Sequence, residues 1–186
     1  MTLFITHKQK IAIQAFFTQA LFISLIAILA MGFASFFYLK IDHAPQIDWG
    51  VTGRWIAMVA RGQFFTPNIN QEPVQAHEWL IGFASHDIIS FIFALTYLFS
   101  LKYVFKTTPS LFNGWLFGLT AMIMPFFIQH PAMGTGILGL ATANPVSTIL
   151  STIFYHSSFG LGLGLGSRWY QTLHKTLSKR AHTDRQ

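Results

Sequence analysis

Two histidines and one aspartate stand inside stretches of the chain that are otherwise apolar. His86 and Asp87 lie in the run 79–103, and His156 lies in the run that follows Pro145. Ionisable groups are costly in a membrane interior, so residues of this kind are candidates for function. Imidazole titrates near neutral pH and ligates metals, which suits it to proton transfer, to acid–base catalysis or to a metal site.

The expected depths of these residues agree. At 1.5 Å per helical residue, His86 and Asp87 lie about 10–12 Å below the outer end of their span, and His156 lies about 15 Å below the outer end of its own. A packed bundle would bring them together, with His130 and Arg54 closing the cluster from the outer surface. The predicted site is therefore a polar funnel that opens outwards, formed by Arg54, His86, Asp87, His130 and His156.

Spacing does not decide what such a site does. The sequence has no His-Glu-x-x-His motif, and no two histidines stand four residues apart within a span, so no metal and no cofactor is assigned. In the competing structural interpretation, each histidine hydrogen-bonds a neighbouring helix and fixes its register. Adjacent residues on a helix do not face each other, so Asp87 should find its partner on another span or at Arg54, or else point into a wet vestibule.

Composition indicates the class of protein. Of 186 residues, 52% are apolar and only 10% are charged, far below the roughly 25% of soluble domains. Twenty phenylalanines suit a surface that faces lipid, and the absence of cysteine excludes disulfides and thiolate chemistry. The net charge of +6 comes from basic residues that flank apolar runs, so it indicates membrane topology and no nucleic-acid partner.

Four apolar runs predict an all-α, four-helix membrane bundle, a single domain over residues 1–186. Spans are expected at about 11–39, 79–103, 111–129 and 146–169, with an outer loop over 40–78 and a cytoplasmic tail over 170–186. The first run is too long for the apolar part of a signal peptide, so it is interpreted as an uncleaved span. Pro125 should kink the third span near its end.

The loops predict a surface helix and an orientation. An amphipathic helix is expected on the outer surface over 52–61, with Arg54 and Arg61 on one face. Nine of the twelve Lys and Arg residues lie in the N-terminal segment, the second loop and the tail, and three lie in the first loop. The positive-inside rule therefore predicts that both termini are cytoplasmic. The lipid bilayer is the expected partner, and a second copy of the chain or another membrane protein is left open.

The segment between the third and fourth runs predicts a tight turn. Gly134 and Gly136 lie in it without the lysine and the preceding strand that a phosphate-binding loop needs. Asn144 is suited to cap the fourth helix, and Pro145 is suited to begin it.

A glycine stripe follows in the fourth run. Gly160 and Gly164 form one small-xxx-small pair, and Gly162 and Gly166 form another. Such pairs let helix backbones approach closely, either within one chain or between copies.

Short motifs along the chain together resemble a known family. They are Asp48-Trp49, Gly53-Arg54-Trp55, Arg61-Gly62, Pro125-Phe126-Phe127, Pro131-Ala132-Met133-Gly134, Gly136, Asn144-Pro145, and His156 followed by Phe159-Gly160-Leu161-Gly162. Over roughly residues 48–167 their order and spacing resemble domain-of-unknown-function family 2938, small bacterial inner-membrane proteins. The resemblance implies a location in the bacterial inner membrane and brings no established activity.

Three functional hypotheses remain at this point. The first is a multi-pass membrane protein that binds or moves a small solute or proton through an outward-facing polar vestibule. The second is a membrane-embedded enzyme that uses His86 and His156, and the third is a structural subunit that packs through its glycine stripe. Alanine at both histidines separates a working site from a structural role.

Overall fold

The computed structural model describes residues 6–42 and 47–183, and this part of the chain is helical without strands, as the predicted all-α class requires. The long helices are α1 (His7–Asp42), α3 (Glu78–Phe99), α4 (Leu111–Ala121) and α6 (Pro145–Thr183). The short elements are α2 (Trp49–Val59), η1 (Ile69–Gln71), η2 (Ser100–Val104), η3 (Pro125–Gln129), α5 (His130–Ala132) and η4 (Ile137–Gly139). Residues 43–46 of the expected outer loop and 184–186 of the expected tail lie outside the described residues.

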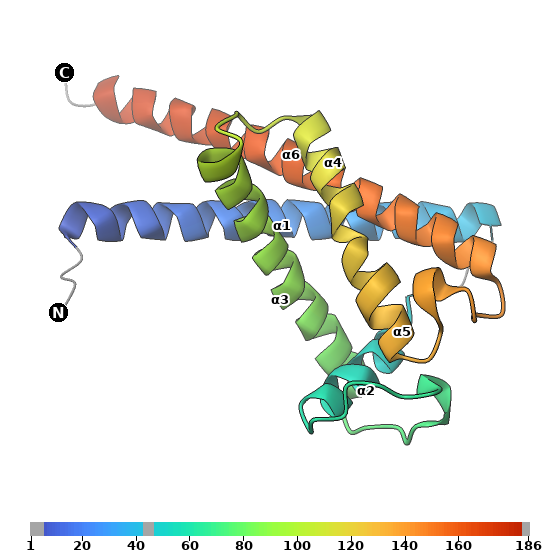
Figure 1. Cartoon of the computed structure of the whole chain (residues 1–186). Helices are drawn as coiled ribbons and strands as arrows, with labels where there is room; N and C mark the ends of the chain where they lie inside the picture. The colour runs from blue at the N-terminus through green and yellow to red at the C-terminus, as the bar shows by residue number, and fades with distance from the viewer. Residues whose placement is uncertain (1–5, 43–46, 184–186) are drawn as a thin grey trace.

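The helices form two crossed pairs (Figure 1). α1 and α6 lie side by side and run in opposite directions, and α6 also packs along α4. α3 and α4 cross this pair and diverge from the turn that joins them. α1 begins and α6 ends on the same side of the molecule, and α2 lies beside the first turns of α3 at the other end.

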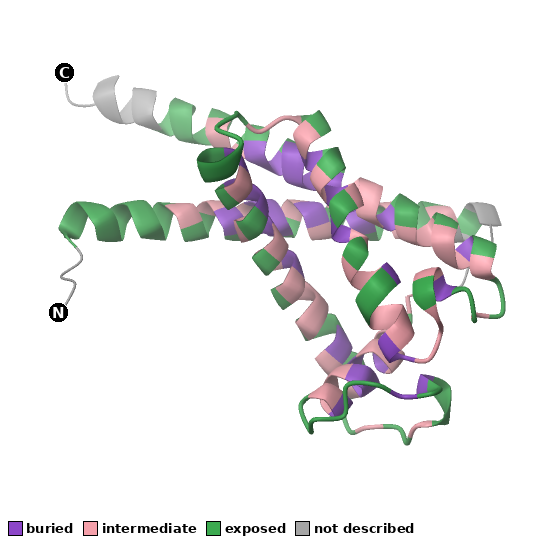
Figure 2. Ribbon diagram, viewed as in Figure 1, coloured by how far each residue is buried: buried purple, intermediate pink, exposed green. Residues whose placement is uncertain are grey.

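Three helical segments are long and apolar enough to cross a membrane: His7–Tyr38, Glu78–Val104 and Leu111–Ala132. Their large apolar side chains point outwards, and Leu29, Phe33 and Ile88 are 68%, 69% and 61% exposed. Figure 2 shows exposed residues recurring along each long helix. Such a surface is stable where lipid is the solvent. The expected fourth span is not among the three segments, because serine, histidine and glycine dilute the apolar residues of α6.

Two helices differ in extent from the sequence-based expectation. α6 continues to Thr183 through most of the expected tail, because no glycine or proline interrupts the chain after Gly166. α2 begins at Trp49, where the Asp48 carboxylate accepts a hydrogen bond from the Val51 N–H at 3.1 Å. It ends before Gly62, which has a φ of 83°. The prediction that Arg54 and Arg61 share one helix face is therefore wrong, since Arg61 lies beyond the helix.

Pro125 widens the third span near its end. Proline lacks the N–H that continues an α-helical ladder. The chain responds with the π-helical segment η3, in which the His130 N–H donates to the Pro125 carbonyl, five residues back. The wider turn brings both Gln129 and His130 to the same cavity wall.

Both glycine pairs of α6 are in contact with helices of the same chain. A Cβ atom on Gly160 would meet the backbone of Gly114 on α4, and one on Gly164 would come within 2.6 Å of the Ser110 carbonyl. On another side of α6, a Cβ atom on Gly162 would come within 2.6 Å of Ala27 Cα on α1. α6 therefore packs between α4 and α1, and glycine on both of these faces allows the close backbone contacts. These contacts answer the question that the sequence left open, because the stripe packs internally.

Candidate ligand cavity

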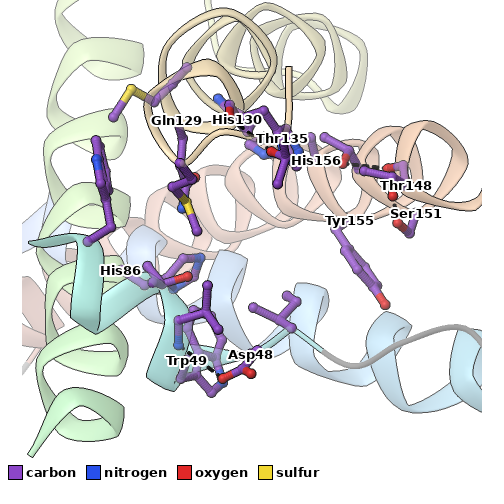
Figure 3. Close-up of a pocket in the computed structure, with 18 of the residues that line it drawn as sticks. Asp48, Trp49, His86, Gln129, His130, Thr135, Thr148, Ser151, Tyr155 and His156 are labelled. Carbon is purple, nitrogen blue, oxygen red and sulfur yellow. Dashed lines mark hydrogen bonds between the residues drawn. The ribbon is translucent and has the colours of Figure 1, made fainter. Parts of the chain in front are cut away.

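A cavity of about 570 Å³ opens between α3, η3 and the first half of α6 (Figure 3). α2 and η1 contribute further wall, and α1 reaches the cavity through Met31. The volume is in the range of about 300–1,000 Å³ that is typical of small-molecule sites. His86, His130 and His156 all line it, although they come from three different elements.

His86 reaches the cavity from α3. Its ring packs against the Trp49 indole, with ring centroids 4.8 Å apart. Its Nδ1 lies 3.7 Å from the Asp87 carboxylate, which is ion-pair range but longer than a hydrogen bond. The expectation that Asp87 does not face His86 and finds its partner on another span or at Arg54 is therefore wrong, since the two side chains come within ion-pair range.

His130 stands at the junction of η3 and α5. Its Nδ1 lies 2.9 Å from the Thr135 hydroxyl, and that hydroxyl also lies 2.9 Å from the His130 carbonyl. The carbonyl can only accept, so the single hydroxyl proton goes to it and Nδ1 must carry the proton of the other bond. In the neutral ring, Nε2 of His130 is then an acceptor.

His156 reaches the cavity from α6. Its Nδ1 is buried and has no hydrogen-bond partner within the described residues. The adjoining Tyr155 also lines the cavity, is 6% exposed, and has an unpartnered hydroxyl within the same part of the chain. Buried polar atoms normally find partners, since leaving one unpaired costs about 1–3 kcal/mol.

Asp87 does not line the cavity. Its side chain is 40% exposed, yet Oδ1 is buried with no hydrogen-bond partner among the residues described. The ionisable side chain that the structure places beside it is His86. Arg54, which was considered as a partner from the outer surface, is engaged elsewhere.

Arg54 also lies outside the cavity lining, in an ion pair that fastens α2 to α3. Its Nε and Nη2 each donate to a different oxygen of Glu78 at 2.9 Å. Its Nη1 donates to the carbonyls of Ile69 and Glu72 at 3.2 and 3.3 Å. The hydrogen bond to Glu78 raises the pKa of Arg54 above its usual value. With four of its N–H groups used in this way, the guanidinium holds the outer loop together, whereas the sequence predicted it at an open site.

Glycine makes the docking of α2 on α3 possible. A Cβ atom on Gly53 would meet the Glu78 carbonyl, and one on Gly82 would meet the Trp49 carbonyl. The backbones of the two helices are therefore in direct contact beside the ion pair. Trp49 and Trp55, on α2, are carried to the cavity by this contact.

The turn between η3 and α6 closes the cavity on the loop side. Gly134 and Gly136 have φ values of 79° and 75°, and a Cβ atom on Gly134 would meet the Pro67 carbonyl. The Asn144 side chain accepts from the Ser147 N–H at 3.2 Å, and Pro145 is the first residue of α6, the arrangement that an Asn-Pro pair predicts.

Backbone hydrogen bonds tie the first loop to this turn. Thr66 N–H donates to the Ala132 carbonyl at 2.9 Å, and Ile69 N–H donates to the Met133 carbonyl at 3.1 Å. The segment that carries His130 is thus held from both sides, by η3 before it and by the first loop packed against it.

Sequence reasoning missed much of the lining. Hydroxyl and amide groups contribute to it, among them Thr142, Thr148, Ser151, Thr152 and Gln129, and aromatic rings face it from Trp49, Trp55, Phe93, Tyr155 and Phe159. The Thr148, Ser151 and Thr152 hydroxyls all donate to backbone carbonyls of α6 or its cap, which leaves their lone pairs as acceptors. The recurrence of threonine and serine around His156 in an apolar run could have indicated this polar part of the lining.

The lining is nearly free of charge. Among the described residues that line it, the one carboxylate is Asp48, which caps α2, and there is no lysine, arginine or glutamate. No group of three or more His, Asp or Glu side chains within the described chain is arranged to hold a metal ion. The cavity therefore offers hydrogen bonds and aromatic faces.

Three helical segments that are long and apolar enough to cross a membrane indicate the class, a helical membrane protein, and these segments border the cavity together with α6. The chain belongs to the family described as protein of unknown function DUF2938, whose model matches residues 21–169. This finding confirms the resemblance to domain-of-unknown-function family 2938. No curated protein and no solved structure matches the chain.

Proposed function

We propose that this protein binds a small solute, or passes a solute or proton, through the cavity that His86, His130 and His156 line. The observation that carries the proposal is where these imidazoles make their contacts. His130 bonds to Thr135, five residues away, His86 lies beside its neighbour Asp87, and Nδ1 of His156 has no partner within the described residues. Histidines that served only to fix helix register would bond to neighbouring helices.

Arg54 and Asp87 have supporting roles in this proposal. Arg54 holds the outer loop and α2 against α3 by its bonds to Glu78, and Asp87 adjusts the orientation of the His86 ring. The glycine contacts of α6 with α1 and α4 favour the binding hypothesis over a subunit that packs through its glycine stripe, since that stripe is already occupied.

The proposed topology has α6 as a fourth span of a four-helix bundle, with both termini cytoplasmic in a bacterial inner membrane. α6 lies between α1 and α4, and its lipid-facing Leu161 and Leu165 are 44% and 53% exposed. The excess of basic residues in the N-terminal segment, second loop and tail supports this orientation. A reporter enzyme fused after Gln186 should be active only in the cytoplasm. An external signal would overturn the four-span arrangement.

The bound solute can be sought without assuming its identity. Native mass spectrometry of the full chain released from its own membranes should show a reproducible added mass. That mass should disappear in the His86→Ala/His156→Ala variant while the variant stays folded. The Ser158→Ala variant is the matched control, because its hydroxyl lies on α6 but bonds to the Phe154 carbonyl and does not line the cavity. A bare protein, or one with bulk lipid alone, would contradict the proposal.

A further inference from the structure

α3 forms one wall of the cavity, and it has few direct contacts with η3 and α6, which form the opposite walls, although α1 packs on both α3 and α6. α3 packs on α1 and α2, whereas η3 packs on α5 and η4, and α4 packs on α6. α3 and α4 diverge from the turn that joins them (Figure 1), and the cavity is lined by residues 85–93 of α3 and by the segment 124–130 beyond α4. A passage between α3 and η3 would therefore open sideways, within the depth of the two membrane-compatible segments.

Exposed apolar side chains lie one helical turn beyond lining residues of both α3 and the segment 124–130. Ile92 follows the lining residue Ile89 by one turn of α3 and is 50% exposed. Ile128 follows the lining residue Met124 by one turn and is 41% exposed. Apolar surface beside both walls suits contact with acyl chains and with an apolar tail that leaves the cavity.

The lining restricts the head of such a molecule. A charged head would be unpaired, because among the described residues the lining carries only the Asp48 carboxylate, which is engaged as a helix cap. Aromatic rings on α2, α3 and α6 favour a flat ring. Two groups on adjoining walls can donate to it, the Gln129 amide on η3 and the His156 imidazole on α6, whose Nδ1 has no partner within the described chain.

We propose that the cavity takes an uncharged, membrane-soluble molecule with a flat ring head that accepts hydrogen bonds and an apolar tail, the chemistry of a quinone, and that this molecule enters from the bilayer between α3 and η3. The inference rests on the proposed binding function and names its ligand class. The ring packs among Trp49, Trp55 and Phe159, its carbonyl oxygens accept from Gln129 and His156, and its tail leaves past Ile92 and Ile128.

The test uses tryptophan fluorescence of the full chain in lipid nanodiscs. Replacing Trp79, Trp115 and Trp169 by phenylalanine leaves only Trp49 and Trp55, both of which line the cavity. Decylubiquinone should quench these two in a saturable manner, and the same quinone without its decyl tail should bind at least tenfold more weakly. Decanoate, which has the tail and a charged head, should not displace the quinone.

Substitutions in this reporter chain test the contacts. His156→Leu and Gln129→Leu should each raise the Kd of decylubiquinone about 2- to 10-fold, the usual effect of a lost hydrogen bond, and Ser158→Ala should leave it unchanged. Ile128→Phe should slow association, and Leu116→Phe, equally lipid-exposed on α4, should not. Thermal unfolding of each variant confirms that it is folded.

Each outcome separates this inference from the function on which it rests. Non-saturable quenching, equal Kd values for the His156→Leu variant and the parent, or displacement by decanoate would overturn the quinone assignment. If native mass spectrometry still shows a different bound molecule in those cases, the binding function stands and only the ligand class is wrong. If Ile128→Phe has no effect on the association rate, entry from the bilayer is wrong.

Discussion

The two halves of α6 differ in how they meet the rest of the chain. From Gly160 to Ser167, alternate residues are glycine, and the helix touches α4 and α1 at backbone distance. From Pro145 to Phe159, the same helix carries serine, threonine, tyrosine and histidine side chains, and it borders an open cavity. Both halves pack on neighbouring helices, but only the half from Pro145 to Phe159 also borders the cavity.

The half from Gly160 to Ser167 therefore belongs to the scaffold, and the half from Pro145 to Phe159 contributes to the candidate site. Close packing leaves no room for ligands, and every side chain in a tight interface is constrained by its neighbours. The half from Pro145 to Phe159 places polar groups, such as the His156 imidazole, and the rings of Tyr155 and Phe159 on the cavity wall. Substitutions between Gly160 and Ser167 should lower stability, whereas those of cavity-lining residues between Pro145 and Phe159 should weaken binding.

The largest expected effect on stability comes from adding a side chain where α4 and the glycine-rich half of α6 are in backbone contact. In Gly114→Val, the new Cβ atom would meet the Gly160 carbonyl and come within 2.6 Å of the Gly164 backbone nitrogen, neither of which can move aside. We expect a loss of about 3 kcal/mol or more in unfolding free energy, and little protein in the membrane. Gly32→Val is the control, because nothing lies within 4 Å of a Cβ atom there. Equal melting temperatures in detergent would contradict the scaffold role.

The next effect concerns the outer loop. Arg54→Met leaves the Glu78 carboxylate without its bidentate partner, in a site where the two side chains are only 10% and 15% exposed. We expect a loss of about 3 kcal/mol and easier proteolysis of the first loop. The Arg54→Met/Glu78→Met variant should recover much of the stability, and Arg61→Met, at an exposed position just beyond α2, should change it by less than about 0.5 kcal/mol. If the double variant is no more stable than Arg54→Met, the loss does not come from leaving the Glu78 carboxylate unpaired.

Composition and local spacing predicted the parts of this fold that depend on near neighbours. The excess of apolar residues predicted an all-helical membrane protein. The Asn144-Pro145 pair predicted where α6 begins, because a cap needs only residues three apart. The glycine pair in α6 predicted a close helix contact, although its partner pair, Gly114 and Gly118, was overlooked in a run with the same four-residue spacing.

The role of Arg54 could not be predicted in this way. Its partner Glu78 is 24 residues further along, across a loop, and reaches it only because α2 crosses α3 at Gly53 and Gly82. An isolated sequence shows an arginine on an amphipathic helix, and such a residue normally faces water. The pairing depends on how two helices dock, which local patterns do not encode.

The candidate site was predicted in part for the same reason. Depth along the helices grouped His86, Asp87 and His156, since helical rise is constant, and of these three His86 and His156 line the cavity whereas Asp87 does not. The aromatic side of the cavity was not predicted, because Trp49 and Trp55 reach it through the docking of α2.

The smallest expected effect on stability is that of His156→Leu, and it is the sharpest test of the cavity-lining half of α6. His156→Leu removes an imidazole whose Nδ1 is buried without a partner among the described residues, and leucine fills similar volume without a polar atom. We expect the unfolding free energy to stay the same or rise by about 1 kcal/mol, while the Kd of the ligand rises about 2- to 10-fold. Thr135→Val, which removes the partner of His130, should instead lower it by about 1 kcal/mol. A residue whose replacement preserves the fold and weakens binding belongs to a site. If His156→Leu destabilises the protein as much as Gly114→Val does, His156 is part of the scaffold and the two halves of α6 do not differ in role.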